Sequence, residues 1–191
     1  MKRTLCYVAL GALATPLLAS AQANLRSTPS GRATTQIAIG PPTVEGQPAP
    51  PAMVVKIDYG QPHARGRAVA GALAADIGKP WRLGANAATA LTTDVDLVIG
   101  GATVPKGTYT LFAETNPGAW KLIINKKTGA EGLEYDAAAD VAKVPLKSRT
   151  LASPIESLTI WLIPGADGAL KGELRIAWGT LEHSVDWSVK Q

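Results

Sequence analysis

Apolar and polar residues alternate with a period of two along most of this sequence, and this period is what most constrains the fold. The segment 181–189 is the clearest case. Its odd positions carry apolar side chains and one histidine, and its even positions carry acidic residues and serines. Successive side chains of a strand point to opposite faces, so this pattern is typical of a strand with one buried face. Val55, Ile57 and Tyr59 repeat it near the start of the domain.

Turn residues divide the alternating region into short strands. Gly100-Gly101, Pro105-Lys106-Gly107 and Asn116-Pro117-Gly118 are the clearest turns. The expected strands are 55–59, 87–92, 94–99, 108–112, 120–125, 141–146, 158–163, 174–178 and 181–189. Short helical turns are expected only at 68–77 and 135–142. Eight or nine short strands predict an all-β fold, an antiparallel β-sandwich or a jelly-roll-like arrangement.

Residues 1–21 have the pattern of a secretory signal peptide. Lys2 and Arg3 precede an apolar run from Thr4 to Leu18, and Ala19-Ser20-Ala21 matches a cleavage site. The run is shorter than the ~20 apolar residues of a spanning helix, and no second run of that length follows. We therefore expect export to the periplasm or the exterior, with no membrane span in the mature protein.

Removal of the signal changes what the composition implies. The only cysteine, Cys6, lies within it, so the mature chain is expected to have no disulfide and no thiolate chemistry. Without Lys2 and Arg3 the 19 basic side chains become 17 against 15 acidic ones, a net charge of +2 rather than +4. No basic cluster remains to follow a phosphate backbone, so nucleic acid is not expected as a partner.

The rest of the chain divides into two parts. Residues 22–52 are rich in proline, which favours extended and unpaired chain. Part of this segment is expected to be a linker, although Thr34–Ile39 could add an edge strand. Residues 53–191 are expected to form a single β domain of ordinary size.

The segment Trp81–Thr89 groups an indole, a guanidinium, a carboxamide and a hydroxyl. Neither the guanidinium of Arg82 nor the carboxamide of Asn86 is easily buried without a partner. In one interpretation both project from a loop and bind an anionic or hydroxylated ligand. In the other, Arg82 pairs internally with Asp58 or Glu156, and Asn86 caps a turn.

Asp58 and Arg67 form a second candidate pair, either as an ion-binding end of the sandwich or as a structural network that also contains Arg82. As an isolated surface pair they would contribute only ~0–1 kcal/mol to stability. The candidate ligand-binding residues are therefore Asp58, Arg67, Trp81, Arg82, Asn86 and Thr89.

The remaining chemistry is sparse. Two histidines, His63 and His183, without a cysteine give no metal-ligand spacing, so no metal and no cofactor are expected. His183 lies on the apolar face of its strand and is interpreted as a core or rim histidine, and His63 as an exposed turn residue. No G-x-S-x-G motif is present. Most of the five tryptophans are interpreted as core anchors rather than as a sugar-stacking platform.

Several motifs occur in a fixed order: Ile57-Asp58-Tyr59, Pro62, Gly66-Arg67, Trp81-Arg82-x-Gly84-Ala85-Asn86-x-Ala88-Thr89, Pro105-x-Gly107-Thr108-Tyr109-x-Leu111-Phe112, Trp120-x-Leu122-Ile123-Ile124-Asn125, Tyr135 with Asp140, and Glu156. From about Ile57 to Trp178 the chain resembles the DUF2911 family of secreted bacterial proteins. The resemblance implies a secreted all-β domain. The function of that family is unknown, so the resemblance supplies no catalytic residues.

Three functional hypotheses follow. The first is a non-enzymatic binding module that holds a small polar ligand or an envelope protein at the cluster around Arg82. The second is an envelope-associated hydrolase, with Asp58 or His63 as the base and Arg82 stabilising negative charge. The third is a structural or assembly protein of the cell envelope that uses exposed sheet edges.

Overall fold

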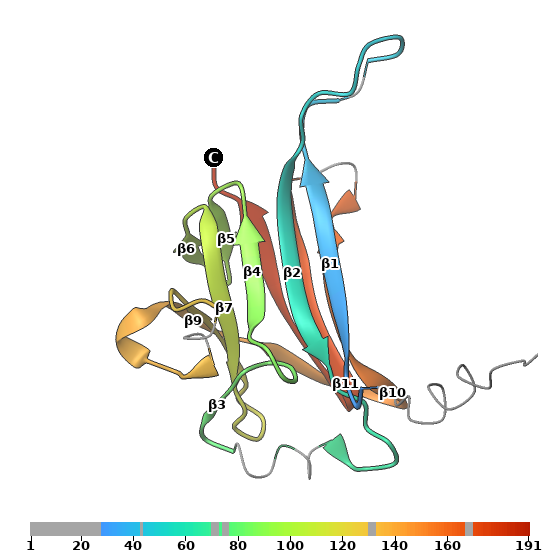
Figure 1. The fold of residues 1–191 in the computed structure, drawn as a ribbon, viewed down its shortest axis with the longest axis vertical. Coiled ribbons are helices and arrows are strands. Elements are labelled where there is room, and N and C mark those ends of the chain that lie inside the picture. The colour runs from blue at the N-terminus through green and yellow to red at the C-terminus, as the bar shows by residue number, and fades with distance from the viewer. Residues whose placement is uncertain (1–27, 43, 70–72, 74–76, 130–132, 167–169) are drawn as a thin grey trace, which may run out of the picture.

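The computed structural model describes residues 28–42, 44–69, 73, 77–129, 133–166 and 170–191. These residues form two antiparallel sheets that pack face to face, so the predicted all-β sandwich is confirmed (Figure 1). The strands are β1 (Gly31–Ile39), β2 (Met53–Gln61), β3 (Pro80–Trp81), β4 (Thr89–Thr93), β5 (Leu97–Ile99), β6 (Ala102–Val104), β7 (Gly107–Glu114), β8 (Lys121–Asn125), β9 (Asp140–Pro145), β10 (Lys147–Pro164) and β11 (Lys171–Val189).

The first sheet has the order β1-β2-β4-β7-β8-β9, and β3 pairs with β7. β1 pairs with β2 along its whole length, from Gly31 opposite Gln61 to Ile39 opposite Met53. The edge strand considered at Thr34–Ile39 therefore exists and begins earlier, at Gly31. Asn116-Pro117-Gly118 connects β7 to β8 as a hairpin, as predicted, with Gly118 at a positive φ.

The second sheet has the order β10-β11-β5-β6, and its two long strands bend sharply. β11 turns at Gly179, which has φ +59. The segments before and after this turn lie side by side: at their far ends the amide of Val189 donates to the carbonyl of Leu170 at 2.7 Å. The predicted strands 174–178 and 181–189 are thus two arms of one strand. Residues 147–150 of β10 pair with the second arm, and residues 159–164 pair with the first.

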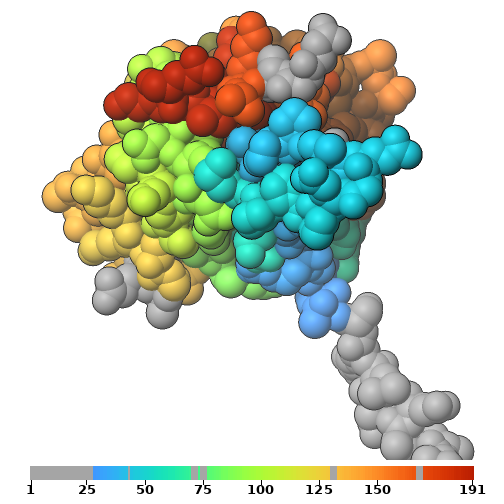
Figure 2. Space-filling model, turned by 90° about the horizontal axis from the view of Figure 1, so that it is seen from above, coloured from blue at the N-terminus to red at the C-terminus, as the bar shows by residue number. Residues whose placement is uncertain are grey.

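The core lies between the two sheets, whose strands occupy opposite sides of the molecule when it is seen from above (Figure 2). Val55, Ile57 and Tyr59 are buried there, as the alternation predicted. The hydroxyl of Tyr59 accepts a bond from the amide of Ile160 at 3.1 Å, which ties β2 to β10 across the edge of the sandwich. Burial raises the pKa of Tyr59, so this phenol stays protonated.

Helical structure is minimal within the described residues. A short 3-10 helix at Ala137–Ala139 stands where a turn was expected at 135–142, and the side chain of Asp136 caps it. The other expected helical turn, at 68–77, lies partly outside the described residues. The signal-like segment 1–21 lies entirely outside them. Among the helices that are described, none is long and apolar enough to cross a membrane.

Candidate functional site

The Trp81–Thr89 segment forms a tight loop that its own hydrogen bonds close. Leu83 and Asn86 both have positive φ, and the Leu83 side chain is fully buried. The Thr89 hydroxyl donates to the Leu83 carbonyl at 2.9 Å, and the Arg82 guanidinium donates to the Asn86 carbonyl at 2.8 Å. Arg82 therefore bonds to the loop backbone, and not to Asp58 or Glu156 as the internal-pairing interpretation expected.

Two glycines let this loop lie against β2. The amide of Ala85 donates to the carbonyl of Gly60 at 3.1 Å. A Cβ on Gly60 would lie 1.7 Å from the Ala85 carbonyl oxygen, and one on Gly84 would lie 2.8 Å from the Thr89 hydroxyl. Only glycine permits so close an approach of two backbones, which explains both residues physically.

Asp58 and Arg67 make separate contacts. Asp58 pairs with Arg32 of β1 and accepts a bond from the Thr34 hydroxyl at 2.8 Å. Arg67 donates to the backbone carbonyls of Ala64 and His63, at 3.1 and 3.0 Å. The predicted network of Asp58, Arg67 and Arg82 is therefore wrong. Asp58 finds Arg32 because β1 lies beside β2, whereas Arg67 and Arg82 each bond to backbone carbonyls three or four residues away.

Trp81 belongs instead to a cluster of rings between the sheets. It stacks on Trp178, with centroids 6.1 Å apart, and meets Trp120 edge to face at 6.4 Å. Trp120 in turn stacks on the imidazole of His183 at 3.9 Å. These geometries suit aromatic contacts, and they fix the orientation of Trp120 from two sides.

A pocket of about 350 Å³ opens next to these rings. We call it the Trp120 pocket, and it is lined by Leu73, Ile77, Thr115, Pro117, Gly118, Trp120, Ser148, Arg149, Thr150, Leu181 and His183. Its wall is mainly apolar, and the polar side chains come from Thr115 after β7, from residues 148–150 of β10 and from His183 of β11. Of the six predicted site residues, none lines this pocket. Trp81 does not line the pocket but packs against Trp120, which does.

His183 is the most unusual residue of the pocket. It is 4% exposed, and its Nδ1 lies 2.8 Å from the Ser148 hydroxyl oxygen. Burial lowers the pKa of His183 to about 4, against a smaller opposing effect of Glu182, so the imidazole is neutral at pH 7. Nε2 is also buried and has no hydrogen-bond partner in the described part of the chain. A buried polar atom of this kind costs about 1–3 kcal/mol, unless a ligand or water supplies the bond.

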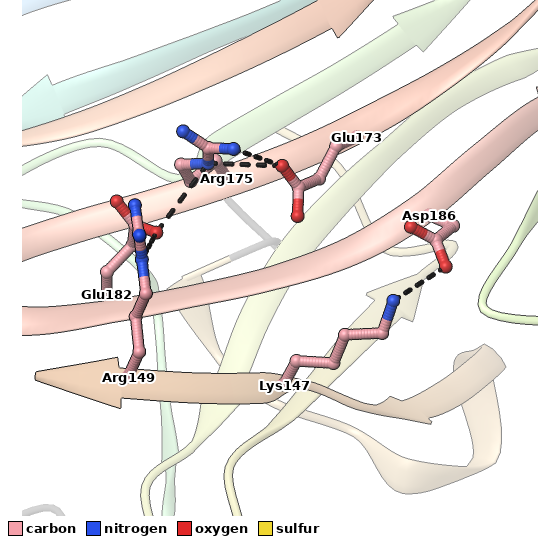
Figure 3. A network of polar contacts seen from close by, with 6 residues as sticks. All are labelled: Lys147, Arg149, Glu173, Arg175, Glu182 and Asp186. Atoms are coloured by element: carbon pink, nitrogen blue, oxygen red, sulfur yellow. Dashed lines mark hydrogen bonds and ion pairs between the residues drawn. The ribbon is translucent and has the colours of Figure 1, made fainter. Parts of the chain in front are cut away.

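A charged network covers the outer face of the second sheet beside the pocket (Figure 3). Arg149 pairs with Glu182, whose side chain is only 8% exposed. Arg175 pairs with Glu173 and lies 3.6 Å from Glu182. The network joins the two arms of β11 to residues 147–150 of β10, and Arg149 is the member that also lines the pocket.

The second histidine has a similar partner elsewhere. Nδ1 of His63 lies 2.7 Å from the Ser157 hydroxyl oxygen, and the two residues form an isolated antiparallel bridge. His63 is half-buried rather than exposed. No group of three or more His, Cys, Asp or Glu residues that could hold a metal occurs within the described ranges.

Sequence reasoning missed Ser148 and Arg149. Residues 147–150 read Lys-Ser-Arg-Thr, with no apolar alternation to mark them as a strand. Ser148 meets His183 only because the two are opposite each other in the β10–β11 register.

Comparison with known proteins adds a family but no activity. No curated protein and no solved structure matches the chain. Residues 43–187 match the family described as "Protein of unknown function (DUF2911)", which agrees with the order of motifs quoted above. The chain therefore belongs to the DUF2911 family.

Proposed function

We propose that this protein binds a small, largely apolar ligand in the Trp120 pocket. The observation that carries the proposal is His183, which lines an open pocket of about 350 Å³ and whose buried Nε2 atom has no partner among the described residues. Small-molecule sites are concave and mostly apolar, with a few polar groups that fix orientation. The Trp120 pocket has this composition.

The polar groups of the pocket suggest what the ligand carries. The neutral imidazole of His183 suits an uncharged carbonyl or hydroxyl group better than it suits an ion. The guanidinium of Arg149 is already paired with Glu182, so it adds little net positive charge. An apolar body with one carbonyl or hydroxyl group therefore fits the pocket best.

The Trp81–Thr89 segment has a supporting role in this proposal. Trp81 packs against Trp120, and the loop that carries Trp81 is closed by its own hydrogen bonds. Arg82 and Asn86 are exposed and engaged with each other. We propose that they hold the loop and do not touch the ligand.

A fragment screen by thermal shift tests the proposal with two matched variants. Thr150 and Thr103 are both exposed strand threonines, but only Thr150 lines the pocket. Thr150→Phe should remove the ligand-induced rise in Tm, and Thr103→Phe should retain it. Arg82→Ala should lower the Tm of the free protein and leave the ligand-induced rise intact.

Two results would contradict the proposal. One is that no fragment raises the Tm of the wild-type protein at millimolar concentration. The other is that Arg82→Ala and Asn86→Ala abolish the rise while Thr150→Phe retains it, which would place the ligand at the exposed loop.

We also propose that the protein acts outside the cytoplasm. The support is the basic, apolar and small-residue order of residues 1–21. Amino-terminal sequencing of the protein from a periplasmic or culture fraction should begin at Gln22. Full-length protein retained in the cytosol would contradict this.

A further inference from the structure

We infer that the Trp120 pocket hydrolyses esters of small apolar acids, with Ser148 as the nucleophile and His183 as its general base. The inference rests on the proposed function, because the ester would occupy the same pocket as the ligand. It moves the hydrolase hypothesis away from Asp58, His63 and Arg82, which lie outside the pocket.

Ser148 and His183 have the arrangement that nucleophilic catalysis requires. Ser148 is exposed and lines the pocket, so a substrate can reach its hydroxyl. His183 is buried behind it, with Nδ1 2.8 Å from the hydroxyl oxygen. A nucleophile and a base within hydrogen-bond reach, with the base held rigidly, form the core of serine hydrolase sites. Here the stacking of Trp120 on the imidazole holds the ring.

A serine–histidine contact alone does not identify a catalytic pair, because the chain holds a second contact of the same kind. Ser157 and His63 approach to 2.7 Å, also through Nδ1 and also as partners in an antiparallel bridge. Cross-strand neighbours meet in this way without any catalytic role. What distinguishes Ser148 is the pocket, which Ser148 and His183 line and which His63 and Ser157 do not.

The reaction balances with water as the only co-reactant. The Ser148 oxygen bonds to the ester carbonyl carbon while Nδ1 of His183 takes the hydroxyl proton. The bond to the leaving alcohol then breaks, and the alcohol takes that proton. Water attacks the acyl-serine and gives a proton to Nδ1, which returns it to the Ser148 oxygen as the carboxylic acid leaves.

The basicity of His183 sets how the reaction responds to pH. With a pKa of about 4, the imidazole is deprotonated from mildly acidic pH upward. The rate should therefore stay flat from about pH 5 to pH 8, without the rise near pH 6.5 of an ordinary histidine base. A base this weak gives slow turnover, so covalent labelling of Ser148 is a more sensitive readout than product formation.

The test uses the full mature protein and an alkyl fluorophosphonate, which phosphonylates activated serines. Peptide mass mapping should place the adduct on Ser148. Ser148→Ala should abolish the labelling, and the matched variant Ser157→Ala should leave it unchanged. His183→Gln should slow labelling by on the order of 10²–10⁴-fold, the usual contribution of a general base. Circular dichroism checks that this variant still folds, and Ser148→Ala, at an exposed position, provides the second test.

The outcomes separate this inference from the proposed function. An absent adduct, or equal labelling of Ser148 and Ser157, overturns the inference. If a fragment still raises the Tm and Thr150→Phe abolishes that rise, the pocket binds a ligand without reacting with it. If neither binding nor labelling occurs, both proposals fail.

Discussion

At the scale of single residues, His183 makes the stability of the protein depend on pH. The unfolded chain takes up a proton on this imidazole near pH 6.5, but the folded protein does so only near pH 4. Between these values the unfolded state binds more protons, so stability falls as the pH falls. The contribution is fully present above pH 6.5 and is lost towards pH 4.

We therefore predict that the free energy of unfolding decreases by up to about 3 kcal/mol between pH 6.5 and pH 4. His183→Gln, which cannot titrate, should remove most of this slope in urea unfolding at a series of pH values. Glu114 and Glu173 also lose stabilising contacts on protonation, but their pKa values are lowered from 4.5, so they act at the acid end of the window. An unchanged slope above pH 4.5 in the variant would contradict the prediction.

Gly60 is the residue at which the smallest substitution should do the most damage. In Gly60→Ala the new Cβ would meet the Ala85 carbonyl oxygen at 1.7 Å, so the Trp81–Thr89 loop must move. We expect a loss of about 3 kcal/mol or more, as for severe overpacking. Gly31→Ala on neighbouring β1 is the matched control, because nothing lies within 4 Å of its Cβ. Chemical denaturation of both variants checks this, and equal midpoints would contradict it.

At the scale of elements, the ion pairs on the outer face of the second sheet differ in how far they are exposed to solvent. Glu182 is almost covered by Arg149 and Arg175, whereas Asp186 and Lys147 are both about 70% exposed. Exposed pairs add little to stability, but removing one member of a desolvated pair leaves the others uncompensated. Glu182→Gln should therefore lower the Tm by several degrees, and Asp186→Asn should leave it almost unchanged.

Differential scanning calorimetry in low salt and in high salt checks this pair of variants. The loss in Glu182→Gln should persist at high salt, since a desolvated pair is screened less than an exposed one. Equal effects of the two substitutions would show that the Arg149–Glu182 contact is no stronger than an ordinary surface pair.

The sequence predicts a strand well where one face of that strand is buried. The alternation in 55–59 and 181–189 identified two strands and their inward faces, and the Asn116-Pro117-Gly118 turn identified a hairpin. It failed at residues 147–150, because a strand whose side chains are all polar shows no period. The pocket depends on this strand, and so its Ser148 and Arg149 could not be found.

The partners of the charged candidates were unpredictable for a related reason. Asp58 pairs with Arg32, and that choice depends on β1 lying in register beside β2. Arg82 satisfies a carbonyl four residues away, which is a local solution that a loop with two residues at positive φ makes possible. Residue types indicate that a charge needs a partner, but only topology decides which one is near.

At the scale of the whole molecule, β1 lies within the proline-rich segment 22–52 but is part of the first sheet. All nine of its residues have partners in β2, and Ile39 is buried in the core. Its Thr35 hydroxyl also accepts a bond from the amide of Leu162, at 3.3 Å, in the opposite sheet. β1 therefore contributes to the pairing of one sheet and to the packing of both.

A chain that begins at Met53 should consequently be much less stable than one that begins at Thr28. Loss of Ile37 and Ile39 from the core removes about 3–5 kcal/mol of apolar burial, which lowers the Tm by roughly 10 °C for a domain of this size. The edge of β2 would also be exposed and free to pair with another chain. Calorimetry and light scattering of chains 28–191 and 53–191 measure both effects. If the shorter chain is monomeric and has the same Tm, β1 is dispensable, and the domain begins at Met53.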